Sequence, residues 1–432
     1  MALLSERIGL IDTENAFKIG PQIREIEGQG KRVVKCNLGE PDFPLPQFIK
    51  DEVKRQIDLD NTHYCDPQGI LPLRKAIAKH FSETRGIQAT PDRVVVFPGA
   101  KPPIGLCQQA YCDPGDEVVY PSPGFPIYES FIAFVGARPV PLHLKEEENF
   151  SLSGKDVAAA LSAKTKILIL NFPSNPTGGV ASKAQLAEIA DAVRARCGKE
   201  MRVFADEVYE DILFDGSQHH SIIGFPGMAE RTVLVSGASK SYSWTGGRLG
   251  WALFPTAEEA EVFRNLNINY FSCVPAYNQE GARLALESPQ SAEAIRTMVT
   301  AFQARREVVV DGLNGIPGIR CQRPKGAFYV FPNIRGACEQ LGIFQAFRSL
   351  PAETQKRTSP STLFQMFLLW EYQVASLDRK SFGRIGTEDM HYLRLSIATD
   401  MESLREGVKR IEAAAQDREG FTRFFKAGKH LV

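Results

Sequence analysis

The chain of 432 residues carries 51 lysines and arginines against 51 aspartates and glutamates, so its formal net charge is zero. A balanced chain has no field that attracts nucleic acid or an anionic membrane, and we therefore expect a small molecule as its partner. The eight cysteines form no CxxC pair and no Cys/His ligand pattern. Their scatter argues against a disulfide scaffold and a zinc site, and it predicts no bound metal and a reducing, cytoplasmic location.

The sequence also gives no sign of a membrane segment. No stretch reaches the roughly 18 uninterrupted apolar residues of a membrane span. The N-terminal residues begin apolar but include Glu6, Asp12 and Glu14, without the continuous apolar core of a signal peptide. We expect neither a span nor a leader.

Short apolar runs between residues 90 and 255 each end at a polar cluster, and longer amphipathic stretches lie between them. This order is typical of an α/β fold, a mostly parallel sheet flanked by helices. The expected strands cover residues 94–97, 117–120, 167–170, 202–205 and 232–235. Between the third and the fourth, residues 182–197 have apolar side chains at helical spacing with Ser182 placed to cap, which predicts a crossover helix.

The pattern changes after residue 255. Helical stretches at residues 258–270, 292–314 and 401–416, with a hairpin-like segment at 324–334, predict a second, smaller α+β domain. The polar residues 349–363 contain Pro351 and Pro360 and predict an inserted surface loop.

Polar clusters at the ends of the expected strands predict where a ligand binds. In an open parallel sheet the site forms outside the carboxyl ends of the strands, so these clusters should converge. The clusters are Gly99-Ala100-Lys101, Phe125, residues 171–178, Asp206 with Tyr209, and residues 236–240 followed by Arg248.

The small residues of the turn FPGAKPPIGL, at 97–106, could expose backbone N–H groups that bind phosphate. Taken alone, an ordinary strand-to-helix turn explains them better. Asp206 and Tyr209 are likewise explained by a helix N-terminus. The functional alternative is a buried aspartate that keeps a pyridine nitrogen protonated, with Tyr209 bonded to the phenolate oxygen of the same ring.

Lys240 lies among small and hydroxyl residues and is followed eight positions later by Arg248. A surface lysine in a Gly/Ser loop is the ordinary interpretation. The alternative is a desolvated lysine beside a cation, whose unprotonated amine forms an imine.

Two further residues have a structural and a functional interpretation. Asn175 lies in NFPSNPTGG, where an irregular loop and a cofactor contact are equally good explanations. Arg394 lies on a strand-like run, where a salt bridge to a structural carboxylate is the ordinary explanation. Its guanidinium equally suits a substrate carboxylate.

The order and spacing of these motifs carry a family resemblance. SKSYSWTGGRLGW at 239–251, NFPSNPTG at 171–178 and DEVY at 206–209 together resemble the class I/II aminotransferases of the aspartate aminotransferase fold, known as fold type I. The resemblance extends from NLGEPDF at 37–43 to the residues around HYLRLSIATD at 391–400. It implies a large domain at 46–298 that binds pyridoxal 5'-phosphate and a small domain formed by residues 1–45 and 299–432.

The resemblance also implies the role of each site residue. It makes Lys240 the Schiff-base lysine and proton shuttle, with Asp206 at the pyridine nitrogen and Tyr209 and Asn175 at the ring hydroxyl. The residues implied to hold the phosphate and the ring are Gly99, Ala100, Lys101, Ser239 and Arg248, with Phe125 stacked on the ring. Gly39, Asn175 and Arg394 would bind the substrate, and Tyr64 would reach the phosphate in a neighbouring subunit of a homodimer.

The implied activity is transfer of an amino group from an L-amino acid to a 2-oxo acid, by a ping-pong mechanism through pyridoxal and pyridoxamine phosphate. A lyase acting on the same cofactor, such as a C–S β-lyase, a decarboxylase or an aminocyclopropane-carboxylate synthase, is the alternative. A non-catalytic ligand sensor is a third, which the absence of a basic helix-turn-helix in the sequence disfavours.

The chain departs from the family pattern at several positions. Pro102-Pro103, Gly247 and Gly237 stand where relatives commonly carry Gln-Ala, Trp and a hydroxyl residue. One hydroxyl at the phosphate is therefore either missing or replaced by Ser236 or Ser239. Residues 350–363 form an insertion that we expect near the substrate entrance.

The sequence does not choose the substrate. A dicarboxylate substrate needs a second cation, and the sequence does not indicate which of Arg7, Lys18, Arg24 and the other basic residues would supply it. Phe17, Ile19, Tyr270 and Phe271 could form an apolar wall, although packing is their ordinary explanation.

Overall fold

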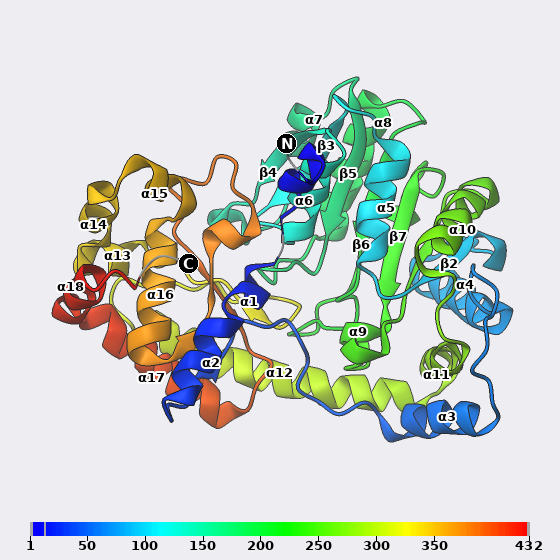
Figure 1. Ribbon diagram of the computed structural model, residues 1–432. Helices are drawn as coiled ribbons and strands as arrows, with labels where there is room; N and C mark the ends of the chain where they lie inside the picture. Colours follow the sequence, from blue (N-terminus) through cyan, green and yellow to red (C-terminus); the bar gives the residue numbers. More distant parts are fainter. Residues whose placement is uncertain (1–2, 13, 430–432) are drawn as a thin grey trace.

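The computed structural model describes residues 3–12 and 14–429. Figure 1 shows a larger body built around a central sheet and a smaller body at the C-terminal end of the chain. The long helix α12 (Gln290–Asn314) runs between them along one side of the molecule. The predicted boundary at residues 298 and 299 falls inside this helix, and the division into domains stays a prediction.

The central sheet confirms the predicted α/β class. Among the described residues it has seven strands in the order β2-β8-β7-β6-β5-β3-β4, and β8 is antiparallel to both of its neighbours. The strands are β2 (Val94–Phe97), β3 (Glu117–Ser122), β4 (Arg138–His143), β5 (Thr165–Asn171), β6 (Arg202–Asp206), β7 (Thr232–Gly237) and β8 (Gly250–Leu253).

All five predicted strands are present, and β4 and β8 were not predicted. The prolines Pro139 and Pro141 hide β4 from a sequence pattern, because proline lacks a backbone donor and is confined to positions such as the edge strand that β4 forms. Strand β8 is the short segment GWAL, whose first two residues belong to the motif SKSYSWTGGRLGW.

Side chains on the two faces of the sheet enter different cores, because successive residues of a strand point to opposite sides. Val95 and Phe97 pack with helices α5, α6 and α10, whereas Val94 and Val96 face the core that includes α4, α7, α8 and α11. Both faces are therefore covered, which leaves the carboxyl ends of the strands as the accessible side.

The helices of the large body are α3 (Gln47–Asp58), α4 (Leu71–Arg85), α5 (Pro102–Tyr111), α6 (Pro126–Phe134), α7 (Gly154–Ala160), α8 (Lys183–Arg196), α9 (Ala238–Ser241), α10 (Ala257–Phe271) and α11 (Ala276–Glu287). Helix α8 is the predicted crossover helix. Ser182 accepts a hydrogen bond from the backbone of Gln185, whose side chain bonds back to the Ser182 N–H, completing a capping box.

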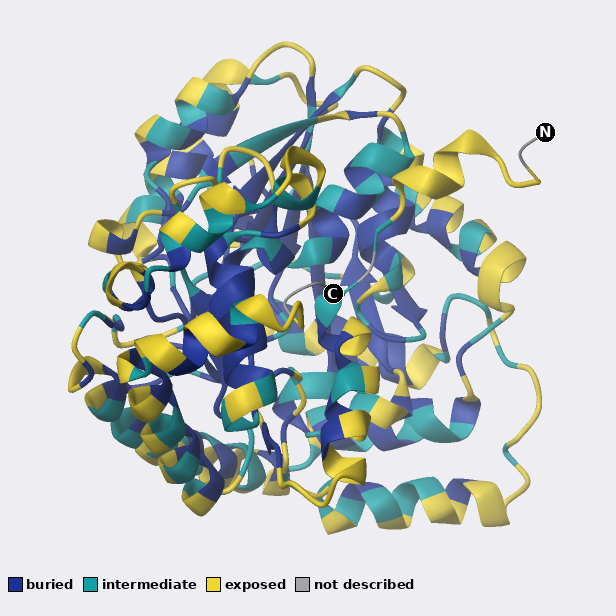
Figure 2. Ribbon diagram, turned by 60° about the vertical axis from the view of Figure 1, so that its left-hand side comes forward, coloured by how far each residue is buried: buried dark blue, intermediate teal, exposed yellow. Residues whose placement is uncertain are grey.

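The smaller body contains α13 (Arg335–Leu341), α14 (Ile343–Ser349), α15 (Ala352–Arg357), α16 (Pro360–Tyr372), α17 (Met401–Gln416) and α18 (Arg418–Lys426). Near the start of the chain lie the 3-10 helix η1 (Glu6–Leu10) and the helices α1 (Asn15–Lys18) and α2 (Gly20–Gly28). Helix η1 lies beside α6 of the large body, where the Asp12 N–H donates to Ser130 Oγ at 2.8 Å. Figure 2 shows that η1 is exposed.

The small sheets join distant parts of the chain. β1 (Val34–Lys35) pairs in parallel with β10 (Val374–Ala375), and β12 (Leu393–Ser396) lies between β11 (Leu377–Asp378) and β9 (Tyr329–Val330). The hairpin expected at residues 324–334 is wrong, because Tyr329 and Val330 pair with the distant Ser396 and Leu395.

The surface loop expected at residues 349–363 is also wrong. Helix α15 occupies its centre, and α16 begins at Pro360 with residues 360–363 buried. Ser359 caps α16 by accepting a hydrogen bond from the Thr362 N–H at 3.1 Å, and Pro360 suits the first helical position because its missing N–H would have no partner there. The pair Ser359-Pro360, which is typical of a loop, here begins a helix.

No helix in the described part of the chain is both long enough and apolar enough to cross a membrane.

Candidate active site

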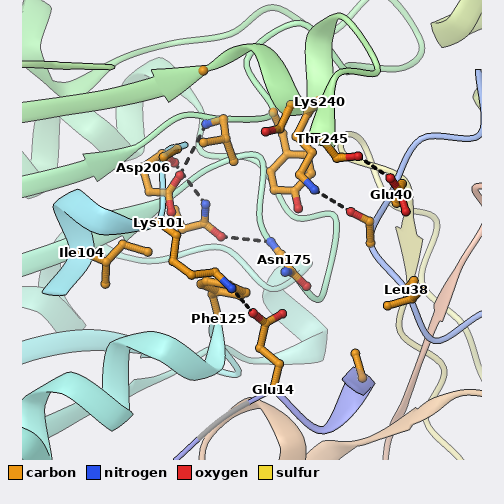
Figure 3. Close-up of a pocket in the computed structure, with 18 of the residues that line it drawn as sticks. Glu14, Leu38, Glu40, Lys101, Ile104, Phe125, Asn175, Asp206, Lys240 and Thr245 are labelled. Atoms are coloured by element: carbon orange, nitrogen blue, oxygen red, sulfur yellow. Dashed lines mark hydrogen bonds and ion pairs between the residues drawn. The ribbon is translucent and has the colours of Figure 1, made fainter. Parts of the chain in front are cut away.

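A cavity of about 450 Å³ opens at the carboxyl ends of the central strands (Figure 3). The predicted convergence of the polar clusters is confirmed. Of the predicted site residues, those that line the cavity are Gly39, Ala100, Lys101, Phe125, Asn175, Asp206, Tyr209, Ser239, Lys240, Arg248 and Arg394. Gly99 and Tyr64 are not among the lining residues.

Lys240 follows strand β7 on the short helix α9, which turns its side chain into the cavity. Its Nζ donates a hydrogen bond to the backbone oxygen of Gly39 and lies 5.8 Å from the ring centre of Tyr209. Withdrawal from water lowers the pKa of Lys240 to about 8, although the Glu14 carboxylate opposes the shift. A usable fraction of the amine is therefore neutral near pH 7.

Gly39 must be a glycine in this arrangement. A Cβ at this position would lie 2.1 Å from the hydroxyl oxygen of Tyr329. The Tyr329 hydroxyl in turn lies 2.8 Å from the Tyr209 hydroxyl, and both rings are buried. The pair fixes Tyr209 at the edge of the cavity.

Asp206 ends strand β6 and is 5% exposed. Its Oδ2 accepts a hydrogen bond from the Tyr128 hydroxyl at 2.6 Å. Burial raises the pKa of Asp206 to about 6, while the bonds from Tyr128 and the Val208 backbone lower it. Tyr128 therefore favours the ionised carboxylate, which can hold a proton on a nitrogen base that faces it.

Asn171, at the end of strand β5, connects two predicted site segments. Its side-chain nitrogen donates to the Asp206 carbonyl at 3.1 Å, and its Oδ1 accepts from the Asn175 backbone at 3.0 Å. The loop of Asn175 and the end of β6 are thereby held in one arrangement.

The other end of the cavity can take an anion. The Arg248 guanidinium reaches the carbonyls of Thr245 and Pro98 at 2.8 and 3.3 Å, and a Cβ on Gly99 would lie 2.3 Å from its Nη2. Gly99 therefore lets this cation approach the turn before α5. A Cβ on Gly250 would lie 2.3 Å from the Ala100 backbone nitrogen. A second glycine, at position 250, is therefore needed for strand β8 to lie against this turn.

Two of the departures noted in the sequence, Gly237 and Gly247, have spatial explanations. Ser239 lines the cavity, whereas Ser236 is buried and donates to Glu210. A side chain on Gly237 would meet the Leu249 carbonyl at 2.8 Å. The indole of Trp244 occupies the space beside Gly247, where a Cβ would lie 2.3 Å from its Nε1. A bulky residue at position 247 would displace that ring.

Arg394 is 4% exposed on strand β12 and lies 4.7 Å from the Tyr329 ring centre. It donates to Asn175 Oδ1 at 3.2 Å and to the Asn37 carbonyl. Its Nε has no hydrogen-bond partner among the described residues, and no described carboxylate forms an ion pair with it. The ordinary explanation of Arg394, a structural salt bridge, therefore fails, and a buried guanidinium remains for a bound carboxylate.

At the mouth of the cavity, predicted residues meet Glu14, which no motif indicated. Lys101 Nζ forms an ion pair with Glu14 and lies 5.6 Å from the Phe125 ring centre. Thr245 donates to Glu40. Figure 3 shows Lys101 extending past Phe125 to Glu14.

Apolar side chains of the N-terminal segment complete the mouth. Phe17 of the proposed apolar wall lines the cavity together with Leu38, whereas Ile19 is buried in the core and Tyr270 and Phe271 are not part of the lining. No residue of the segment 350–363 lines the cavity, so the expectation that it lies at the substrate entrance finds no support here.

The side chains that line the cavity fit one cofactor. A lysine with a lowered pKa, a buried carboxylate facing the cavity, an arginine beside a glycine turn and an aromatic ring suit the aldehyde, the pyridine nitrogen, the phosphate and the ring of pyridoxal 5'-phosphate. This fold and this site define the class of pyridoxal-phosphate enzymes of fold type I.

Comparison with known proteins narrows the class. The family model described as aminotransferase class I and II matches residues 31–411. A probable aspartate/prephenate aminotransferase of Aquifex aeolicus is 34% identical, over 96% of this chain and 99% of the relative. An aromatic-amino-acid aminotransferase of Thermococcus litoralis is 32% identical, over 96% and 99%. The crystal structure of the aspartate aminotransferase of Rhizobium meliloti is 30% identical, with a TM-score of 0.84 over 96% of this chain and 99% of that one.

The chain belongs to the class I and II aminotransferases. It is a pyridoxal-phosphate-dependent enzyme, and the aminotransferase names of these relatives do not favour the lyase alternative.

Proposed function

We propose that the cavity around Lys240 is the site at which this chain moves an amino group from an L-amino acid to a 2-oxo acid. The single observation that supports it best is the Lys240 amine, whose pKa is lowered to about 8 by desolvation in the same cavity as Asp206 and Arg394. A neutral amine can bond the cofactor aldehyde and later accept a proton.

The residues divide into three groups in this proposal. At the phosphate end, Arg248 supplies charge and Gly99, Ala100, Lys101 and Ser239 supply backbone or hydroxyl donors. Around the ring, Phe125 stacks, Asp206 faces the pyridine nitrogen, and Asn175 and Tyr209 bond the ring hydroxyl. Gly39, Asn175 and Arg394 receive the α-carboxylate of the substrate.

When bound, pyridoxal phosphate supplies an electron-accepting ring that acidifies the Cα–H bond of the amino acid. Asp206 keeps the pyridine nitrogen protonated, so that the ring can accept charge. The fork-shaped Arg394 guanidinium binds the carboxylate through two N–H groups and orients Cα. Lys240 Nζ then accepts the proton that leaves Cα. A 2-oxo acid occupies the same carboxylate site in the second half of the ping-pong reaction.

A half-reaction separates transamination from lyase chemistry. We expect the loaded enzyme, mixed with an amino acid and no 2-oxo acid, to release at most one equivalent of oxo acid per subunit and no ammonia. Mass spectrometry of the cofactor should then show pyridoxamine phosphate. Continued release of ammonia and oxo acid would contradict the proposal.

We also propose a homodimer in which Tyr64 of each subunit reaches the phosphate of the other. In support, Tyr64 is 88% exposed and so accessible to a second subunit, and helix α10 leaves Val262, Ile268 and Tyr270 exposed, which a partner would cover. Mixing inactive K240A and weak Y64F subunits tests this directly. A hybrid dimer contains one site with both native residues, so activity should recover on mixing, and unchanged activity in verified hybrids would contradict the shared site.

The location is proposed from the cysteines. All eight are free, and a reducing compartment such as the cytoplasm keeps thiols in that state.

A further inference from the structure

Four cationic side chains line the cavity in the part of the chain that the structure describes: Lys101, Lys240, Arg248 and Arg394. The proposed function uses three of them for the phosphate, the cofactor aldehyde and the substrate α-carboxylate. Of these four, only the side chain of Lys101 is left to bind a second carboxylate on a substrate. Its ammonium is already ion-paired with Glu14.

Glu14 is held close to the reacting end of the cavity. Its side chain is 17% exposed, and its charge acts on Lys240, Tyr329 and Arg394. A substrate carboxylate that approached Lys101 would have to displace Glu14 or lie beside it. Either route is unfavourable, because like charges repel and a displaced carboxylate loses its partner.

Other residues that line the same cavity add apolar surface and a second negative charge. Phe17 and Leu38 line the cavity with large apolar side chains, and Glu40 adds a second carboxylate that is bonded to Thr245. An apolar substrate side chain gains contact area here. A carboxylate meets two negative charges and no unpaired described cation beyond those already used.

We infer that Glu14, by occupying Lys101, selects amino acids with neutral, apolar side chains and rejects dicarboxylates. This inference rests on the proposed function. It assigns Glu14 as a specificity-determining residue, and family membership alone does not make this choice. The Glu14–Lys101 ion pair acts by making the site unfavourable for a second substrate carboxylate.

The test compares kcat/KM for aspartate and for phenylalanine in one enzyme preparation. The native enzyme should prefer phenylalanine. In E14Q the shape is retained but the charge is lost, which leaves Lys101 unpaired. We expect the ratio of kcat/KM for aspartate to kcat/KM for phenylalanine to rise by at least about tenfold. The unpaired Lys101 ammonium can then bind the second carboxylate of aspartate, whereas phenylalanine gains nothing from it.

Two further variants, E40Q and E14Q/K101M, test whether the effect of E14Q comes from the unpaired Lys101 or only from the loss of one negative charge. E40Q removes the other carboxylate of the mouth without freeing a lysine, and its ratio should change by less than about threefold, as expected for a screened charge. In the double variant E14Q/K101M, the ratio should return toward the native value. An E40Q ratio that rises as much as that of E14Q would overturn the inference.

Binding of non-reacting acids gives a readout that does not depend on turnover. Calorimetry on the loaded enzyme should show tighter binding of succinate to E14Q than to the native enzyme, with 3-phenylpropanoate nearly unchanged. A native enzyme that prefers aspartate, or an unchanged ratio in E14Q, overturns the inference and leaves the proposed function intact. If no amino acid yields an oxo acid, the proposed function itself fails.

Discussion

The base and the mouth of the cavity are built differently. The base consists of strand ends and of Tyr128 on helix α6, and Asn171, Asp206 and Tyr128 are buried and joined by hydrogen bonds. The mouth comes largely from the N-terminal segment, where Phe17 is 65% and Leu38 39% exposed. The base is rigid enough to position reacting atoms, whereas the mouth can change its residues without disturbing the sheet.

Two lysines show the contrast. Lys240 at the base has no ion-pair partner among the described residues, and desolvation lowers its pKa to about 8. Lys101 at the mouth is paired with Glu14, and its side chain is 45% exposed. A lysine without a counter-charge is available for covalent chemistry, whereas a paired lysine is a charge that a neighbour has cancelled.

The largest effect is expected from K240A. Loss of both the cofactor bond and the proton acceptor should lower kcat/KM by more than about 10⁴-fold. Cofactor should still bind through the phosphate end, but borohydride should no longer link it to the chain. Turnover within a factor of about 10² of the native value, judged against typical general-base effects, would contradict the assignment.

Asp206→Asn should lower kcat by about 10²- to 10³-fold, because the amide cannot hold the pyridine nitrogen protonated. Y128F is the milder test of the same group. It removes the hydroxyl that bonds Asp206 Oδ2, and a loss of about tenfold is expected for a hydrogen bond to a charged group. Steady-state kinetics measures both, and a larger loss in Y128F than in Asp206→Asn would reverse their proposed order.

Arg85→Ala tests the support beneath the base. Arg85 is ion-paired with Glu207 at 2.8 Å and with Glu210, and Glu210 accepts a hydrogen bond from Ser236 on β7. Its loss leaves two buried carboxylates without that partner, so the free energy of unfolding should fall by about 3–5 kcal/mol. The matched control R194A breaks an exposed pair with Asp191 and should cost no more than about 1 kcal/mol. Urea unfolding of both variants gives the comparison.

The reactivity of the cofactor-free chain should depend on pH. The neutral fraction of Lys240 rises as pH increases through its pKa of about 8, instead of the ordinary 10.5. The rate at which pyridoxal phosphate becomes borohydride-reducible on Lys240 should therefore have a midpoint near that pH. In E14Q the midpoint should fall, because the Glu14 charge favours the protonated amine. A native midpoint above pH 10 would contradict the desolvated base.

The smallest effect is expected for the stability of E14Q. The Glu14–Lys101 pair is partly exposed, so its loss should change the free energy of unfolding by no more than about 1 kcal/mol. If E14Q changes the choice of substrate but not the stability, the mouth sets specificity independently of the folded base. A loss above about 2 kcal/mol, outside the range for such pairs, would make Glu14 a structural residue.

The base was predictable from the sequence because its residues lie in short motifs at strand ends. Lys240 and Arg248 are eight positions apart, and Asp206 closes an apolar run. At the mouth, Gly39 and Lys101 were named through the family resemblance and Phe17 as part of an apolar wall. The contact between Glu14 and Lys101 was not predicted, because 87 positions separate the two residues and no motif joins them. Tyr128 was missed for the same reason, since 78 positions separate it from Asp206.

Helix α12 limits how the two bodies can move. Its 25 residues span about 37 Å at 1.5 Å per residue, and its only glycine, Gly312, lies near the end. Sharp kinks arise at proline, glycine pairs or bulges, so a helix of this composition transmits a rotation instead of absorbing it. A change of angle between the bodies would then be taken up by other connections, one of which is the stretch at 36–46 with Pro41, Pro44 and Pro46. That stretch carries Gly39 and Glu40, so such a movement would reshape the mouth first.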